Sequence, residues 1–261
     1  MAMGKLDRAA LEIASLEYPD LQPEPWLAVL DAHASALAAR VAPNAAGIDF
    51  LEAANEYLFG DLGFRGEEAN YYDPRNSCLN EVLEFRTGLP ITLSVVYMEI
   101  CRRLARPVYG IGLPGHFIVQ YDDGCFSAYL DPFHQGAVLS VEECFALART
   151  ATGTDVPSDP ALLKPVTHRQ LLQRMLNNLR AVYFSRQNWA KALRVLDLVV
   201  EVNPNSAEDR KQRGVTQLRL NRMHAARVDL ERYLELSPEA ADAEEIRKQL
   251  LDLRQYLAGL N

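Results

Sequence analysis

The chain has 261 residues, of which 49% are hydrophobic and 24% are charged, as is ordinary for a folded protein with one or two domains. Its 35 acidic residues outnumber the 27 basic ones, and the net charge of −8 argues against direct binding to nucleic acids, whose phosphates need a basic surface. We find no apolar run of the roughly 20 residues that a membrane helix needs and no signal-peptide core near the N-terminus. The spacing of the cysteines is not typical of a zinc site or a disulfide framework. We therefore expect reduced thiols and a cytoplasmic location.

The N-terminal region is expected to be helical. Apolar residues recur at helical spacing in residues 5–16, 25–41 and about 48–59. Residues 64–78 are polar and typical of a loop, and a short helix over 79–85 follows them.

A mostly apolar helix is predicted from Pro90 to Leu104. Proline suits the first turn of a helix, because its missing N–H would have no helical partner there. Apolar residues occur on most sides of this segment, so we expect the helix to lie buried at the centre of its domain.

Three strands follow the central helix, over residues 108–112, 117–121 and 126–130, where β-branched and aromatic residues are frequent. Asp122-Asp123-Gly124 predicts a tight hairpin turn between the second and third strands. Ser140 and Glu143 form a capping-box pattern that marks the start of another helix.

The C-terminal part of the chain repeats, because residues 173–206 align with residues 207–240. Ala192 matches Ala226, at the place where the two helices of one repeat cross. A period of about 34 residues with a small residue at the crossing and a proline in the turn resembles the tetratricopeptide repeat (TPR). A further amphipathic helix over 241–257 is expected to cap the repeats.

Five motifs in this order, followed by the repeats, resemble the SirB-type bacterial family, in which a transglutaminase-like domain precedes short TPRs. The motifs are Gly63-Phe64, Asn70–Leu79, Glu81–Leu93, Gly112–Ile118 and Asp131–Phe133. The resemblance implies an α+β fold, with a papain-type central helix on a small antiparallel sheet and C-terminal α-hairpins. We therefore expect a first domain over 1–150 with the N-terminal helices, a linker over 151–168, and two repeats with a capping helix over 169–261.

Active transglutaminase-like enzymes open the central helix with Gly-x-Cys, and a His and an Asp come later in the chain. His116 and Asp131 match these two positions, but Pro90 stands where the cysteine is expected. Proline has no nucleophile, so the resemblance implies a pseudoenzyme. We predict a non-catalytic protein- or peptide-binding scaffold or regulatory partner, which binds other proteins through its TPRs.

The alternative is a cysteine- or hydroxyl-dependent hydrolase or acyltransferase that uses His116 and Asp131 with a nucleophile from elsewhere or an activated water. The hydroxyls of Thr92 and Ser94, near the helix start, are candidates. Cys78 lies in a loop that can fold back over the pocket, and a thiolate beside a histidine would be activated. Cys101 lies about three helical turns beyond Pro90, roughly 16 Å away, and is expected to be a buried small hydrophobe. In a purely structural interpretation, His116 and Asp131 hydrogen-bond across two neighbouring strands and only stiffen the sheet.

A polar cluster is expected around the start of the central helix. It contains Asn76, Asn80, Arg86, Pro90 and Thr92. The free N–H groups of a helix start suit an anion or a carbonyl, and Arg86 would reinforce that preference. The cluster either binds a small acidic or amide-bearing ligand, or caps helices and satisfies loop backbone.

We predict neither a cofactor nor a metal ion. His134 follows Asp131 closely and would complete a three-residue ligand set with His116, but nothing in the spacing demands a metal. The expected partners are proteins or peptides bound through the repeats, with no direct contact to nucleic acid or membrane. The sequence does not set the oligomeric state.

Overall fold

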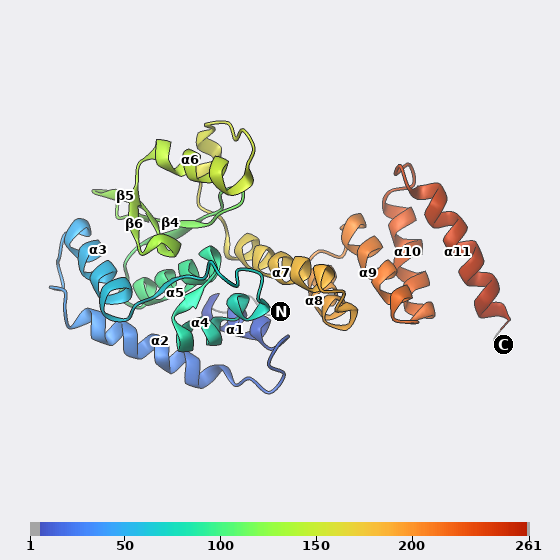
Figure 1. Ribbon diagram of the computed structural model, residues 1–261, viewed down its shortest axis with the longest axis horizontal. Coiled ribbons are helices and arrows are strands. Elements are labelled where there is room, and N and C mark those ends of the chain that lie inside the picture. The colour runs from blue at the N-terminus through green and yellow to red at the C-terminus, as the bar shows by residue number, and fades with distance from the viewer. Residues whose placement is uncertain (1–5, 260–261) are drawn as a thin grey trace. The chain divides into compact units, whose positions relative to one another are not determined.

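The computed structural model describes residues 6–259, which form two compact units that meet in the chain between Met175 and Leu176 (Figure 1). Unit 1 combines helices with a small sheet, and unit 2 consists of helices. The predicted α+β class is confirmed. Residue 5, where we expected the first helix to begin, lies outside the described residues.

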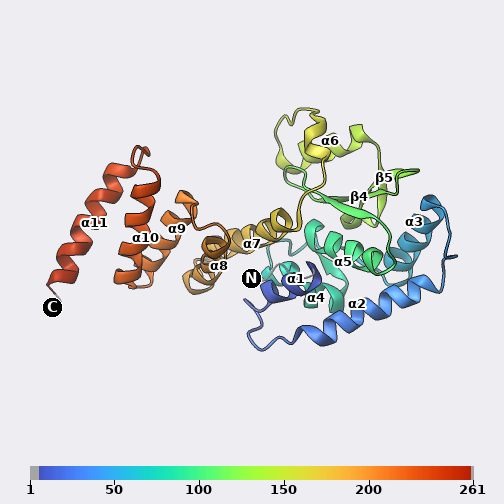
Figure 2. The same cartoon turned by 180° about the vertical axis from the view of Figure 1, so that it is seen from behind.

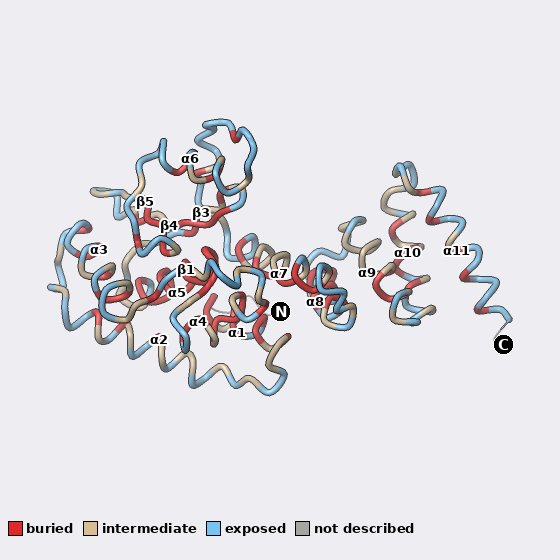
Figure 3. Tube along the Cα trace, in the orientation of Figure 1, coloured by how far each residue is buried: buried red, intermediate tan, exposed pale blue. Residues whose placement is uncertain are grey.

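The helices of unit 1 surround one buried helix, α5. The helical elements that precede the sheet are α1 (Leu6–Ala14), α2 (Pro23–Ala38), α3 (Gly47–Asn55), a π-helical turn η1 (Glu56–Asp61), η2 (Pro74–Ser77), α4 (Leu79–Phe85) and α5 (Pro90–Arg103). Every residue from Pro90 to Cys101 is buried (Figure 3). Helices α1, α2 and α4 and strands β3 and β4 all contact α5. The predicted central helix therefore forms the core on which the site is built.

The C-terminal end of α5 is tied to α1 by charged groups. Asp7 and Glu99 are each 1% exposed, and Arg103 donates to both carboxylates at 2.6 and 2.9 Å. Arg102 also donates to both. Buried carboxylates are retained only when such partners compensate for lost hydration. This network holds the far end of α5 in place.

The sheet of unit 1 has the strand order β3-β4-β5-β6, with antiparallel neighbours. Its strands are β3 (Val108–Ile111), β4 (Ile118–Asp122), β5 (Ser127–Asp131) and β6 (Ala137–Leu139). The predicted hairpin joins β4 to β5: Gly124 has a φ of 83°, and the Asp123 carboxylate accepts the N–H groups of Cys125 and Phe126. A separate parallel pair joins β1 (Arg65–Gly66) to β2 (Thr87–Gly88).

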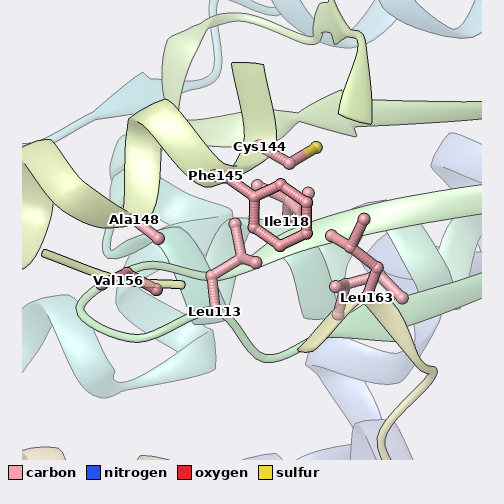
Figure 4. Close-up of a cluster of buried hydrophobic side chains, with 8 residues drawn as sticks. Leu113, Ile118, Cys144, Phe145, Ala148, Val156 and Leu163 are labelled. Atoms are coloured by element: carbon pink, nitrogen blue, oxygen red, sulfur yellow. The ribbon is translucent and has the colours of Figure 1, made fainter. Parts of the chain in front are cut away.

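Helix α6 (Val141–Thr152) covers the sheet through a second apolar cluster (Figure 4). It begins with the predicted capping box, since Ser140 and Glu143 exchange hydrogen bonds. The segment that we expected to be a linker adds Val156 and Leu163 to this cluster, includes the turn η4 (Pro160–Leu163), and pairs Pro165 with Ile111. The polar composition of this segment gave no indication that Val156 and Leu163 would be buried. The compact unit extends to Met175 instead of ending at residue 150.

Unit 2 stacks antiparallel helices in the manner of TPRs (Figure 2). It contains the end of α7 (His168–Ser185), then α8 (Trp189–Val202), α9 (Ala207–Arg219), α10 (Met223–Leu236) and α11 (Ala243–Ala258). Ala192 and Ala226 are fully buried, as expected of residues at helix crossings. A Cβ on Gly214 would lie 2.9 Å from the Leu230 side chain, so any larger residue would require Leu230 to shift where α9 approaches α10. Within residues 6–259, no helix is both long and apolar enough to cross a membrane.

Candidate functional site

The site lies where α5 contacts strand β4 and the turn η3 (Pro132–His134), which follows β5. Pro90 is the first residue of α5 and is buried, as the sequence predicted. The Thr92 hydroxyl accepts the Leu89 N–H at 2.9 Å and donates to the Asn76 carbonyl at 2.9 Å. The Ser94 hydroxyl donates to the Pro90 carbonyl at 2.7 Å. Both hydroxyls of the first turn therefore bond to nearby backbone.

His116 is placed by a tight turn before β4. Gly115 has a φ of 70°, a conformation that favours glycine, and a Cβ there would lie 3.0 Å from the Ala151 backbone. Arg174, on α7, donates to the carbonyls of Leu113 at 2.8 Å and of His116 at 2.7 Å. Burial lowers the pKa of its guanidinium. The clamp of Arg174 holds both ends of the turn and so sets the position of the imidazole.

The Asp131 carboxylate ends β5 and is shared between two imidazoles. Its Oδ2 lies 2.9 Å from Nε2 of His116 and 2.7 Å from Nδ1 of His134. Burial raises the pKa of Asp131, but the bonds from His116 and His134 outweigh it and bring the pKa below its ordinary value. An ionised carboxylate only accepts, so both imidazole nitrogens donate to it. The predicted His116–Asp131 pair thus lies within hydrogen-bond distance.

The turn that carries His134 is fixed by groups on other elements. Oδ1 of Asp131 accepts the Phe133 N–H at 2.9 Å, and the Asp131 carbonyl accepts the Gly136 N–H at 2.8 Å. Asn55 donates to the Gly136 carbonyl at 2.9 Å. A Cβ on Gly66 would lie 2.6 Å from the Phe133 ring, so β1 packs closely against the turn η3 (Pro132–His134). The turn is therefore held on two sides.

Exposure differs between the two imidazoles. The His116 side chain is 7% exposed, and the edge-to-face ring of Phe133 lies 5.8 Å from it. The His134 side chain is 49% exposed, and its ring lies 5.8 Å from that of His116, nearly parallel. Solvent therefore reaches the His134 side chain, whereas the Asp131 side chain that it contacts is 1% exposed.

The predicted pocket residues do not all meet at this point. Asn76 donates to the Asn70 carbonyl, and lines a hollow of about 250 Å³ with Asp73, Arg75 and Glu81. Arg86 donates to the Leu62 carbonyl at 2.8 Å. These bonds match the expectation that the polar side chains satisfy loop backbone. Ligand binding by this group stays a prediction.

Two polar atoms in residues 77–80 are buried without a hydrogen-bond partner in the described part of the chain. Ser77 Oγ and Asn80 Oδ1 are buried and have no hydrogen-bond partner among the residues that the structure describes. Buried polar groups are normally paired, often with water. Asn80 was among the predicted pocket residues, whereas Ser77 was not singled out.

The cysteines of the chain are free thiols. Cys78 is buried at the start of α4, and its Sγ lies 3.5 Å from the Pro74 carbonyl. Burial raises the pKa of the Cys101 thiol, and it raises that of Cys144 to about 11. Cys125 is exposed beside the hairpin turn. A thiol with a raised pKa is a poor nucleophile at neutral pH.

Sequence reasoning missed two positioning residues, Arg174 and Asn55, and one contact of His134. Arg174 lies 58 residues beyond His116 in a segment that we assigned to the repeats. Asn55 precedes Gly136 by 81 residues and also accepts from the Tyr97 hydroxyl. His134 was considered, but its contact to Asp131 depends on the tight turn η3. No periodic or local signal marks such long-range contacts.

Comparison with known proteins bears on both units. Residues 24–177 match the transglutaminase-like superfamily, and residues 179–251 match the tetratricopeptide repeat. A UPF0162 protein of Xylella fastidiosa is 40% identical over 249 residues, which cover 94% of this chain and 88% of that protein. A UPF0162 protein of Pseudomonas aeruginosa is 29% identical, with coverage of 95% and 90%.

A partial likeness extends to animals. F-box only protein 21 of Mus musculus is 34% identical over 137 residues, which cover 49% of this chain and 21% of that protein. The two full-length matches and the two domain matches agree with the order of motifs and repeats in the sequence. The chain belongs to the UPF0162 (SirB-type) family, in which a transglutaminase-like domain is followed by tetratricopeptide repeats.

Proposed function

We propose that this protein is a non-catalytic scaffold or regulatory partner that holds another protein or a peptide through unit 2. The observation that carries this proposal is a groove of about 580 Å³ between α7, α9 and α11. Its apolar lining includes Phe184, Val215, Leu218 and Ile246.

The chemistry of the groove suits a peptide with apolar side chains. Polar residues of the same lining include Gln212, Arg219, Glu245 and Gln249, which can bond to peptide backbone. Binding sites for peptides and small ligands commonly combine an apolar floor with a few polar groups that set orientation. TPRs generally mediate contacts between proteins, which supports the same assignment.

The region around Pro90 supports the non-catalytic part of the proposal. A nucleophile is missing at the first position of α5, and the hydroxyls of Thr92 and Ser94 bond to backbone. The His116–Asp131 pair is retained, but Pro90 replaces the cysteine with which such a pair acts in a Cys-His-Asp triad.

Trp189 offers a readout for binding in the groove. Its ring lies 5.7 Å from that of Phe184, and the Arg219 guanidinium lies 4.3 Å above it. Both neighbours line the groove, so an occupant that moves them should change Trp189 fluorescence. We would capture partners from a bacterial lysate, synthesise peptides from the captured proteins, and titrate them into a Trp26→Phe variant of the full chain.

Matched variants test where such a peptide binds. Val215→Glu places a charge in the groove and should weaken binding at least ten-fold. Val228→Glu makes the same change at a 55% exposed position of α10, outside the groove lining, and should leave binding unchanged. Equal effects of the two substitutions, or saturable binding that neither affects, would contradict the proposal.

The hydrolase or acyltransferase remains a second candidate because His116 Nε2 bonds to Asp131, as in a Cys-His-Asp triad. That arrangement leaves Nδ1 of the ring for a nucleophile. A thiol-reactive probe on the native protein tests the cysteine form of this idea. Labelling of Cys78 that Cys78→Ser abolishes would support it, whereas labelling confined to Cys125 would count against it.

The proposed location is the cytoplasm. All four cysteines are free thiols, as is usual in a reducing compartment. Fractionation of cells that express the tagged full chain tests this, and recovery in a membrane or periplasmic fraction would contradict it.

A further inference from the structure

One cluster in unit 1 has the composition of a metal site. Nε2 of His116, Oδ2 of Asp131 and Nδ1 of His134 all lie within 4.8 Å of one another. Two imidazoles and one carboxylate are ligands that Zn²⁺ and the other divalent transition metals accept. We propose that His116, Asp131 and His134 bind one divalent transition-metal ion. This inference is independent of the peptide groove in unit 2.

The distances are close to those that a bound ion needs. Zinc lies about 2.0–2.2 Å from nitrogen and oxygen ligands, so tetrahedral ligands are about 3.3 Å apart. The two imidazole nitrogens lie 2.9 and 2.7 Å from the same carboxylate oxygen. Opening each contact by about half an ångström, through small side-chain rotations, would admit an ion between the three atoms.

The convergence on a single oxygen is the feature that favours a metal over a structural hydrogen-bond pair. Oδ1 of Asp131 is occupied by the Phe133 N–H, whereas Oδ2 faces both imidazoles. A histidine that serves only to pair a buried carboxylate needs no second histidine at the same oxygen. On binding, each neutral imidazole keeps its proton by moving it to the other ring nitrogen, and its freed lone pair bonds to the ion.

The surrounding groups hold the three ligands without depending on the ion. Arg174 fixes the backbone at His116, and the Phe133 and Gly136 N–H groups fix Asp131. Outer contacts of this kind orient the ligands of metal sites and strengthen binding. The His134 side chain is 49% exposed, so one of the three ligands is in contact with solvent. Three protein ligands also leave a coordination position for water or another ligand.

The test uses the full chain with its affinity tag removed, after treatment with a chelator. Titration with Zn²⁺ by calorimetry should show one ion per chain with a dissociation constant in the micromolar range or below. Co²⁺ should give a visible absorption spectrum that Zn²⁺ displaces. Thermal unfolding of the wild-type chain should shift to higher temperature when Zn²⁺ is present, since an ion that binds the native state stabilises it.

Three variants locate the ion. His134→Ala removes a ligand that is half exposed, so the fold should survive, and Zn²⁺ affinity should fall at least ten-fold with loss of the Co²⁺ spectrum. Asp131→Asn retains the shape of the side chain and should weaken binding similarly. His224→Ala changes an exposed histidine of unit 2 and should have no effect.

The proposal is overturned if the wild-type chain binds less than one equivalent of Zn²⁺ at 100 µM. It is equally overturned if binding and the Co²⁺ spectrum are unchanged in His134→Ala. Should Asp131→Asn fail to fold, the His134→Ala result alone decides between the two outcomes. Loss of Zn²⁺ binding would leave peptide binding by unit 2 unaffected, so the two proposals fail separately.

Discussion

A buried aspartate of unit 1 and one of unit 2 each lie between two nitrogen-bearing side chains, and the two carboxylates are used differently. Asp131 in unit 1 and Asp229 in unit 2 are each 1% exposed. The partners of Asp131 are the imidazoles of His116 and His134. Those of Asp229 are the guanidinium groups of Arg210 and Arg213 on α9, at 2.6 to 2.8 Å.

The difference separates a structural site from a candidate chemical site. Guanidinium groups stay charged, bond to both oxygens of Asp229 and have no lone pair for a metal, so they can only neutralise the carboxylate. Imidazoles can exchange a proton or bind a metal ion, and here they converge on one oxygen of Asp131. Burial of a carboxylate therefore does not indicate function by itself, and the identity of its partners does.

The largest effect should come from Asp229→Ala. It leaves two arginines without their shared buried partner, and we expect unit 2 to lose about 3 kcal/mol of unfolding free energy. The measurement is urea unfolding followed by Trp189 fluorescence in a Trp26→Phe background, which reports unit 2. Asp197→Ala removes an exposed carboxylate 3.1 Å from Arg213 and should cost less than about 1 kcal/mol. Equal losses would show that burial of Asp229 does not matter.

The next effect should come from Arg174→Ala in unit 1. Two buried carbonyls, those of Leu113 and His116, would lose a charged donor, and we expect a loss of about 2 kcal/mol. Trp26 fluorescence in a Trp189→Phe background measures it. Arg174→Lys keeps the charge but cannot reach both carbonyls with a planar fork, so its loss should be smaller yet measurable. If Arg174→Ala keeps the wild-type free energy of unfolding, Arg174 does not stabilise the turn that carries His116.

His134→Ala should cost little stability in the presence of a chelator. Its side chain is 49% exposed, and Asp131 keeps its bonds from His116 and the Phe133 N–H. We expect less than about 1 kcal/mol in the Trp26 measurement. Arg213→Ala, the counterpart beside Asp229, should cost unit 2 clearly more. If His134→Ala loses more unfolding free energy than Arg213→Ala, the contacts of Asp131 stabilise the fold as much as those of Asp229, and the proposed difference between the two sites is wrong.

The thiols sharpen the comparison without changing stability, because all four cysteines lie in unit 1. In native protein only the exposed Cys125 should react rapidly with a thiol reagent, and Cys125→Ser should abolish that signal. Cys144 is buried and its pKa is raised to about 11, so little thiolate forms at neutral pH. The buried thiols should react only as Trp26 reports unfolding. Rapid labelling of Cys78 in the native protein would favour the hydrolase or acyltransferase over the non-catalytic scaffold.

Local patterns in the sequence predicted several details of the fold because their causes are local. The start of α5 at Pro90, the turn at Gly124 and the capping box at Ser140 depend on single residues and their immediate neighbours. The small residues at helix crossings repeat with the TPR period, so Ala192 and Ala226 were recognised as buried contacts.

The sequence by itself determined the α+β class, the repeats, and the pairing of His116 with Asp131 through the family resemblance. Only the tertiary structure decided that residues 151–165 pack against the sheet, that Arg174 clamps the His116 turn, and that His134 shares the oxygen bonded by His116. The physical reason is the distance along the chain over which each kind of interaction acts. Periodicity and capping act within a few residues, whereas Arg174 contacts the turn at His116 from 58 residues away, and the His134 contact depends on how its turn is oriented by its neighbours.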